Sequence, residues 1–173
     1  MDAIRRAGYE STTERSLYTL GVAEPLDVVG IKEFPTSHFA CFIAWDALQS
    51  SKALVTSVVE RLLYAGATYI CAWGPGCNGV HDVADEARES QCGGADDRAH
   101  PVVMTTSHAS DSLQDALWVF LFLTFPDERF EEPTRSGLAI TIGNSVWEEQ
   151  IRQALQDPAA FAGRALASKP PKV

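Results

Sequence analysis

The chain has 173 residues, 46% of them hydrophobic and 21% charged, which is the composition of one globular domain long enough to bury a core. A formal net charge of −9 argues against a general electrostatic attraction to nucleic acid or to an anionic membrane surface. The longest apolar run, residues 116–125, is too short to span a bilayer, and residues 1–14 lack the apolar core of a signal peptide, so we expect a cytoplasmic protein.

The first part of the chain has the least regular pattern. Residues 1–16 are polar, and residues 17–31 mix short apolar pieces with glycine and proline. We therefore interpret residues 1–37 as an N-terminal arm with at most one edge strand. A single α/β domain is expected over residues 38–166, followed by a disordered tail over residues 167–173.

From residue 39 onward, short apolar runs alternate with helical periodicity. Strands are predicted over residues 39–45, 68–73, 101–106 and 138–142. Helices are predicted over residues 51–65, 78–90, 113–125 and 145–161, with a loop over residues 126–135. The candidate helix caps are Ser50 or Ser51, Asp111 or Ser112, and a capping box of Ser145 with Glu148.

This alternation predicts an α/β fold of three layers, with helices on both faces of a doubly wound sheet. The sheet should be mainly parallel, with four to five strands, as in Rossmann and flavodoxin-like folds. Right-handed crossovers place the carboxyl ends of all four predicted strands at one edge, where such folds bind ligands. The sequence therefore predicts where a site would lie.

Three phrases carry a resemblance to a known family: Cys-Ala-Trp-Gly-Pro-Gly-Cys with Val-His-Asp and Asp-Glu after it, Val-Met-Thr-Thr-Ser-His, and Ala-Leu-Trp-Val-Phe-Leu. Together they resemble uncharacterised bacterial proteins classed as a domain of unknown function. The resemblance spans roughly residues 38–155 and implies one compact bacterial domain, without implying a reaction. The sequence carries no nucleotide-binding, kinase, hydrolase or zinc-ribbon signature.

Several residues at the expected carboxyl edge have side chains or backbone suited to a ligand. The Gly-Pro-Gly turn before a helix leaves amide groups that attract anions, although any tight turn from strand to helix favours glycine. Hydroxyls and a histidine bind phosphate or ribose, and they also make ordinary turn hydrogen bonds. Trp45 and Trp73 either stack on a base or cover the core. The candidate ligand-binding residues are Trp73, Gly74, Gly76, Thr105, Thr106, Ser107, His108 and Asn144.

A second set of residues suggests a catalytic function. Cys77 is expected in the first turn of a helix, where the dipole lowers a thiol pKa, and His81 follows one turn later. Asp46 or Asp85 would orient the histidine, which makes these four the candidate catalytic residues. Cys77, His81 and Asp85 with His108 also have the donor atoms of a zinc site, but their spacing over two turns does not converge on one ion, so no metal is assigned. The alternative for the acids of this helix is a solvated face.

The remaining cysteines are expected to be inert. Without a secretory signal, all four cysteines should be reduced thiols. Cys41 and Cys71 fall inside predicted strands, where cysteine packs as a small apolar side chain, and Cys92 opens a loop over residues 92–97.

Two functions follow. The first is binding of a nucleotide-like or phosphorylated small molecule at the carboxyl edge, with hydrolysis by Asp46 or Asp85 as an extension. The alternative is a non-catalytic interaction or immunity-type protein, whose acidic surface meets a basic protein or whose apolar helix over residues 113–125 makes a homodimer. No cofactor is assigned, and no nucleic acid or membrane is expected as a partner.

Overall fold

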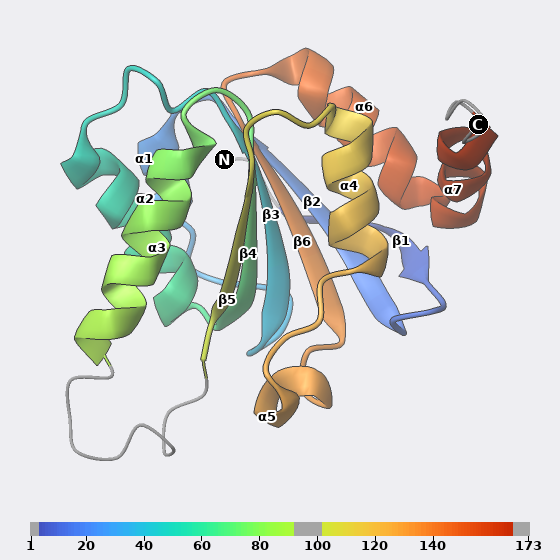
Figure 1. The fold of residues 1–173 in the computed structure, drawn as a ribbon, viewed down its shortest axis with the longest axis horizontal. Helices are drawn as coiled ribbons and strands as arrows, with labels where there is room; N and C mark the ends of the chain where they lie inside the picture. Colours follow the sequence, from blue (N-terminus) through green and yellow to red (C-terminus); the bar gives the residue numbers. More distant parts are fainter. Residues whose placement is uncertain (1–3, 92–101, 168–173) are drawn as a thin grey trace.

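The structure is a computed structural model that describes residues 4–91 and 102–167. Its centre is a six-stranded sheet in the order β1-β2-β6-β3-β4-β5 (Figure 1). The strands are β1 (Arg5–Glu10), β2 (Arg15–Val22), β3 (Phe39–Trp45), β4 (Ala67–Trp73), β5 (Met104–His108) and β6 (Ser136–Ile142). Strands β2 to β6 run parallel to one another, and β1 is antiparallel to β2. The predicted α/β class is confirmed, with six strands rather than four or five.

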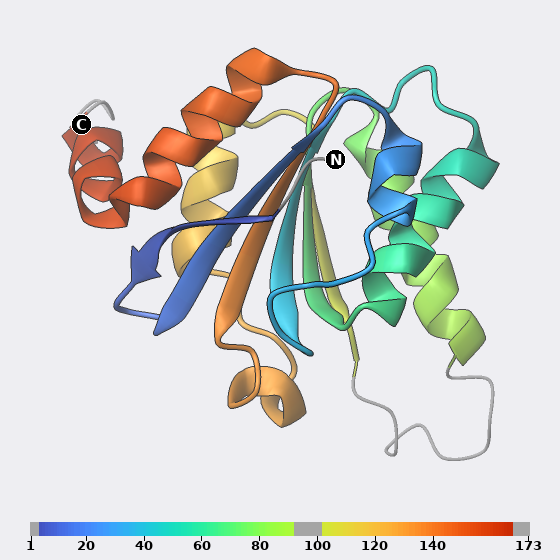
Figure 2. The same ribbon diagram turned by 180° about the vertical axis from the view of Figure 1, so that it is seen from behind.

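Helices cover both faces of the sheet (Figures 1 and 2). One face carries α1 (Pro25–Val29), α2 (Lys52–Tyr64) and α3 (Cys77–Gln91), and the other carries α4 (Leu113–Phe122), α6 (Ser145–Gln156) and α7 (Pro158–Ala167). A short helix, α5 (Glu128–Glu131), lies beyond the amino end of the parallel strands, within the predicted loop. Each face has its own apolar core, and every residue of β3 and β6 is buried between the two.

The N-terminal segment differs most from expectation. Residues 1–37 hold β1, β2 and α1, and β2 lies inside the sheet between β1 and β6 rather than in an extended arm. Strand β6, the last in the chain, is inserted between β2 and β3. The pairing of β2 with β6 joins Tyr18 to Leu138, so no local pattern could reveal it.

The helix starts show which caps form. Ser51 caps α2 and Ser112 caps α4, each through its hydroxyl. The predicted capping box of Ser145 with Glu148 is wrong, because Asn144 caps α6 by accepting hydrogen bonds from the N–H groups of Val146 and Trp147. The Glu148 carboxylate instead lies against β2, where a Cβ placed on Gly21 would come within 2.1 Å of its Cδ.

Two further boundaries differ for simple reasons. The predicted last helix is two helices, because Pro158 lacks an N–H and disfavours helical geometry at Asp157 before it. Strand β5 begins at Met104 and extends to His108, which the sequence had placed after the strand. The loop over residues 92–97 lies outside the described residues, as do residues 168–173 of the predicted tail.

Candidate functional site

The parallel strands all end at one edge of the sheet, at the top of Figure 1. The loops that leave this edge lead to different faces: those after β3 and β4 lead to α2 and α3, whereas those after β5 and β6 lead to α4 and α6. The candidate site residues are therefore divided among several places rather than gathered in one.

The Gly-Pro-Gly turn is shaped by close packing of two loops. Gly74 and Gly76 have φ angles of +110° and +77°, a region that favours glycine. A Cβ on Gly74 would lie 2.6 Å from the Trp45 carbonyl oxygen, and the Pro75 carbonyl accepts a hydrogen bond of 2.8 Å from the Ala47 N–H. The turn thus locks the loop after β4 against the loop after β3.

Cys77 opens α3, but it is only 1% exposed. Burial raises the pKa of its thiol, and the backbone N–H groups of His108 and Asn78 oppose this effect only in part. The expected lowering of the Cys77 pKa is therefore wrong. Burial also raises the pKa of Cys71, to about 12, as befits a thiol packed in the core.

His81 and Asp85 do come together on α3. The Nδ1 atom of His81 lies 3.7 Å from Oδ2 of Asp85 and 3.5 Å from Oδ1 of Asp82. Oδ1 of Asp85 accepts a hydrogen bond of 2.7 Å from the Thr105 hydroxyl on β5. Among residues 4–91 and 102–167, no three or more His, Cys, Asp or Glu side chains are grouped so that they could hold a metal ion.

A second cluster lies where β5 leads into α4. The Nδ1 atom of the buried His108 is 2.6 Å from Oδ2 of Asp111, and its Nε2 atom is 3.2 Å from the Thr106 hydroxyl. The indole N–H of Trp73 donates a hydrogen bond of 2.9 Å to the Asp111 carbonyl, and the Trp73 ring meets Trp147 edge-on at 4.9 Å. Sequence reasoning considered Asp111 only as a helix cap. Its spacing of three residues from a histidine was the signal for this pair.

The other candidates lie outside both clusters, and Asp46 and Asn144 bond the local backbone. Oδ1 of the exposed Asp46 accepts a hydrogen bond of 3.3 Å from the Leu48 N–H, which closes a turn. Asn144 caps α6, as described above, and Ser107 is half-buried on β5. Trp45 is buried in the core, so of the two tryptophans only Trp73 is partly accessible.

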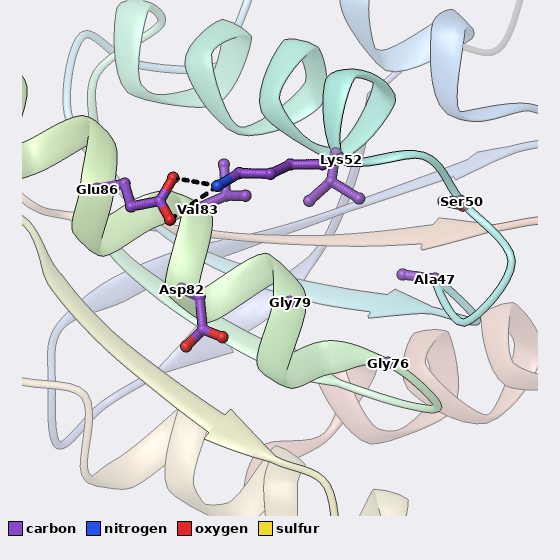
Figure 3. A pocket seen from close by; sticks show the side chains of 9 residues that line it. Ala47, Ser50, Lys52, Gly76, Gly79, Asp82, Val83 and Glu86 are labelled. Atoms are coloured by element: carbon purple, nitrogen blue, oxygen red, sulfur yellow. Dashed lines mark hydrogen bonds and ion pairs between the residues drawn. The ribbon is translucent and has the colours of Figure 1, made fainter.

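A groove of about 270 Å³ lies between α2 and α3 at the same edge (Figure 3). Lys52 reaches across from the start of α2, and its Nζ lies 2.7 and 2.8 Å from the two carboxylate oxygens of Glu86 on α3. Gly76 is the one candidate residue that lines it. The other lining residues are Ala47, Ser50, Lys52, Val55, Gly79, Asp82, Val83 and Glu86.

Residues 20–158 match a family described as a domain of unknown function (DUF7684). The chain belongs to this family. No curated protein matches the chain. The DUF7684 match runs from β2 to the first residue of α7, so it includes the α2/α3 groove and the His108 cluster, whereas β1 and Arg15 lie outside it. In the part of the chain that the structure describes, no helix combines the length and apolarity needed to cross a membrane.

Proposed function

We propose that this member of the DUF7684 family binds a small phosphorylated molecule with free hydroxyl groups, such as a nucleotide or a sugar phosphate, in the groove between α2 and α3. The observation that carries the proposal is the meeting of an ammonium, two carboxylates and open helix backbone in one hollow at the carboxyl edge. Open α/β sheets bind ligands at this edge.

The start of α2 suits the phosphate. Ser51 caps the helix by accepting from the Leu54 N–H at 3.2 Å, and the free amides of a first helical turn attract anions together with the dipole. Lys52 adds a full positive charge. Its ion pair with Glu86 is exposed, at 69% and 56% of the two side chains, and such pairs contribute about 0–1 kcal/mol, so a phosphate can replace Glu86 at little cost.

The face of α3 suits hydroxyl groups. Asp82 and Glu86 lie one turn apart on it, and carboxylates accept hydrogen bonds from the paired hydroxyls of ribose and other sugars. Gly79 lies between these acids and the Gly-Pro-Gly turn. Apart from its chain neighbours and the backbone of its own helix, no atom of the described residues lies within 4 Å of the position that a Cβ at Gly79 would occupy. Gly79 thus leaves open space at the groove.

A blocking substitution tests the proposal. Gly79→Leu fills the groove, while Gly163→Leu on α7, where a Cβ would also meet no atom within 4 Å, is the matched control. Calorimetric titration with AMP, ribose 5-phosphate and inorganic phosphate should give binding of at least one phosphate ester to the wild type and to Gly163→Leu, weakened at least about tenfold in Gly79→Leu. Equal binding to all three proteins, or no binding to any, would contradict the proposal.

Hydrolysis is not part of the function that we propose. Asp46 and Asp85, the acids expected to act in it, do not line the groove. Release of inorganic phosphate from the same esters, followed by a colorimetric assay, should therefore stay at the buffer rate. Release that disappears in Asp85→Asn would restore a catalytic role for the α3 cluster.

A second candidate, self-association, is favoured by apolar side chains near the end of α4. Leu123 and Phe125 are 53% and 58% exposed, next to the ring pair of Trp118 and Phe122 at 4.8 Å. A homodimer would cover them. Sedimentation velocity over a wide concentration range should show a dimer that Phe125→Ser weakens, and a monomer at all concentrations would exclude it. A basic protein partner, suggested by the net charge of −9, stays a proposal.

A further inference from the structure

A second hollow, of about 410 Å³, lies at the amino edge of the sheet, opposite the proposed phosphate groove. It lies between the turn of the β1–β2 hairpin and the connection from α4 through α5 to β6. This pocket is independent of the proposed function, because it shares no lining residue with the groove.

The pocket is lined in part by a buried guanidinium. Arg15, at the start of β2, is only 5% exposed. It donates hydrogen bonds of 2.8 and 2.7 Å to the hydroxyl and the carbonyl of Thr124, just past the end of α4. Its Nε–H has no acceptor among the residues that the structure describes. A guanidinium has five donor hydrogens: two are used on Thr124 and the buried Nε–H is enclosed by protein, so the hydrogens left for a ligand in the pocket are the second ones on the two Nη nitrogens.

The expected counterion of Arg15 is engaged elsewhere. Glu10 is directly opposite Arg15 in the hairpin register, but its carboxylate accepts from the N–H groups of Thr12 and Thr13 at 2.8 and 2.6 Å and from the Thr13 hydroxyl at 2.7 Å. Among the described residues no carboxylate makes a direct ion pair with Arg15; burial holds the pKa of Arg15 below its ordinary value and outweighs the nearby charge of Glu10, which tends to raise that pKa. A buried charge without a directly paired counterion is costly, so an anionic group in contact with Arg15 would be favoured.

The rest of the lining has a net negative charge. Arg135 is already held by Glu14 at 2.6 Å and by Glu132 at 3.4 Å. Glu128 and Glu131 on α5 add two further carboxylates to the lining. A simple anion such as phosphate would meet these acids, whereas a ligand with one carboxylate and an excess of positive charge satisfies both parts of the pocket.

We propose that this pocket binds a free basic amino acid, with its carboxylate on Arg15 and its cationic groups beside Glu128 and Glu131. Bidentate pairing of guanidinium with carboxylate gives the orientation, and the α5 acids select for positive charge.

Matched ligands test the two ends separately. L-Arginine and agmatine differ only in the carboxylate, and L-citrulline lacks the side-chain charge. In titrations of the full chain followed by ¹⁵N NMR, L-arginine should bind, and the other two should bind at least about tenfold more weakly. The Nε–H signal of Arg15 should shift with L-arginine. Equal binding of agmatine, or no binding of L-arginine at about 10 mM, would overturn the proposal.

Substitutions of α5 complete the test without disturbing Arg15, whose loss would free the end of α4. The double change Glu128→Gln and Glu131→Gln should weaken L-arginine binding at least about tenfold, while Glu60→Gln on the exposed side of α2 should not. Unchanged binding in the double variant would overturn the proposal. An unchanged Tm in both variants shows that the fold is intact. If the groove between α2 and α3 binds no phosphate ester, the expected results of these experiments on the second pocket stay the same.

Discussion

Nδ1 of His108 lies 2.6 Å from Oδ2 of Asp111, within the turn that connects β5 to α4. Because the Asp111 carbonyl also accepts the indole N–H of Trp73, this pair links β4, β5 and the start of α4. It holds together the carboxyl edge on the α4 side of the sheet.

Removing this contact should therefore lower stability. Asp111→Ala leaves the buried His108 without its Nδ1 partner, at a cost of about 1–3 kcal/mol in the free energy of unfolding. Urea denaturation measures it, with Glu60→Ala as the surface control, expected to change stability by less than about 0.5 kcal/mol. Equal stability of the two variants would show that the pair contributes nothing.

Cys77 should be unreactive in the folded protein. Burial raises the pKa of its thiol, so little thiolate exists near neutral pH, and access is closed. In a Cys92→Ser background, alkylation of Cys77 by iodoacetamide at pH 8, followed by peptide mass spectrometry, should be at least about tenfold slower than that of glutathione. Fast alkylation of the native protein would return Cys77 to the list of nucleophiles.

Replacing Gly74 or Gly79, which lie on either side of Cys77 in the sequence, by alanine should change the free energy of unfolding in opposite directions. Gly74→Ala is strained by the φ of +110° and by the Trp45 carbonyl 2.6 Å away, and should cost at least about 2 kcal/mol. Gly79→Ala enters open space within a helix and should stabilise the protein by about 0.5–1 kcal/mol. Urea denaturation curves measure the change in the free energy of unfolding for each variant. A loss of stability in Gly79→Ala would show that the backbone at the groove is not regular helix.

Glu10 should make stability depend on pH. Burial tends to raise the pKa of its carboxyl, but hydrogen bonds from Thr12 and Thr13 hold it below the ordinary value of 4.5. A depressed pKa in the folded state contributes stability that is present above pH 4.5 and is lost as the pH falls through the folded value. The stability advantage of the wild type over Glu10→Gln should thus be largest near neutral pH and shrink in acid. A difference that is constant with pH would exclude this linkage.

Parts of the fold were predictable because a strand that is buried on both faces has a continuous apolar sequence. Strands β3 and β6 are buried along their whole length, and their sequences are continuous apolar runs. Strand β2 could not be recognised in the same way. It begins with Arg15 and includes Thr19, buried polar residues whose surroundings depend on segments far along the chain, among them Thr124.

The candidate site was predictable only as far as topology fixes it. The rule for sheet edges correctly placed Trp73 and His108 near each other, since they pair across β4 and β5. The rule could not say that His108 contacts Asp111 on one face while His81 lies on α3 over the other. The groove was missed because Lys52 and Glu86 meet only when α2 and α3 are packed side by side.

The place of β6 in the sheet has a consequence for biosynthesis. Both of its neighbours, β2 and β3, leave the ribosome long before it, and they do not pair with each other. Until residues 136–142 emerge, the strand that β2 and β3 both pair with in the folded protein is missing. A chain that stalls or is cut before β6 therefore leaves two strand edges without their final partner, and unpaired edges favour aggregation.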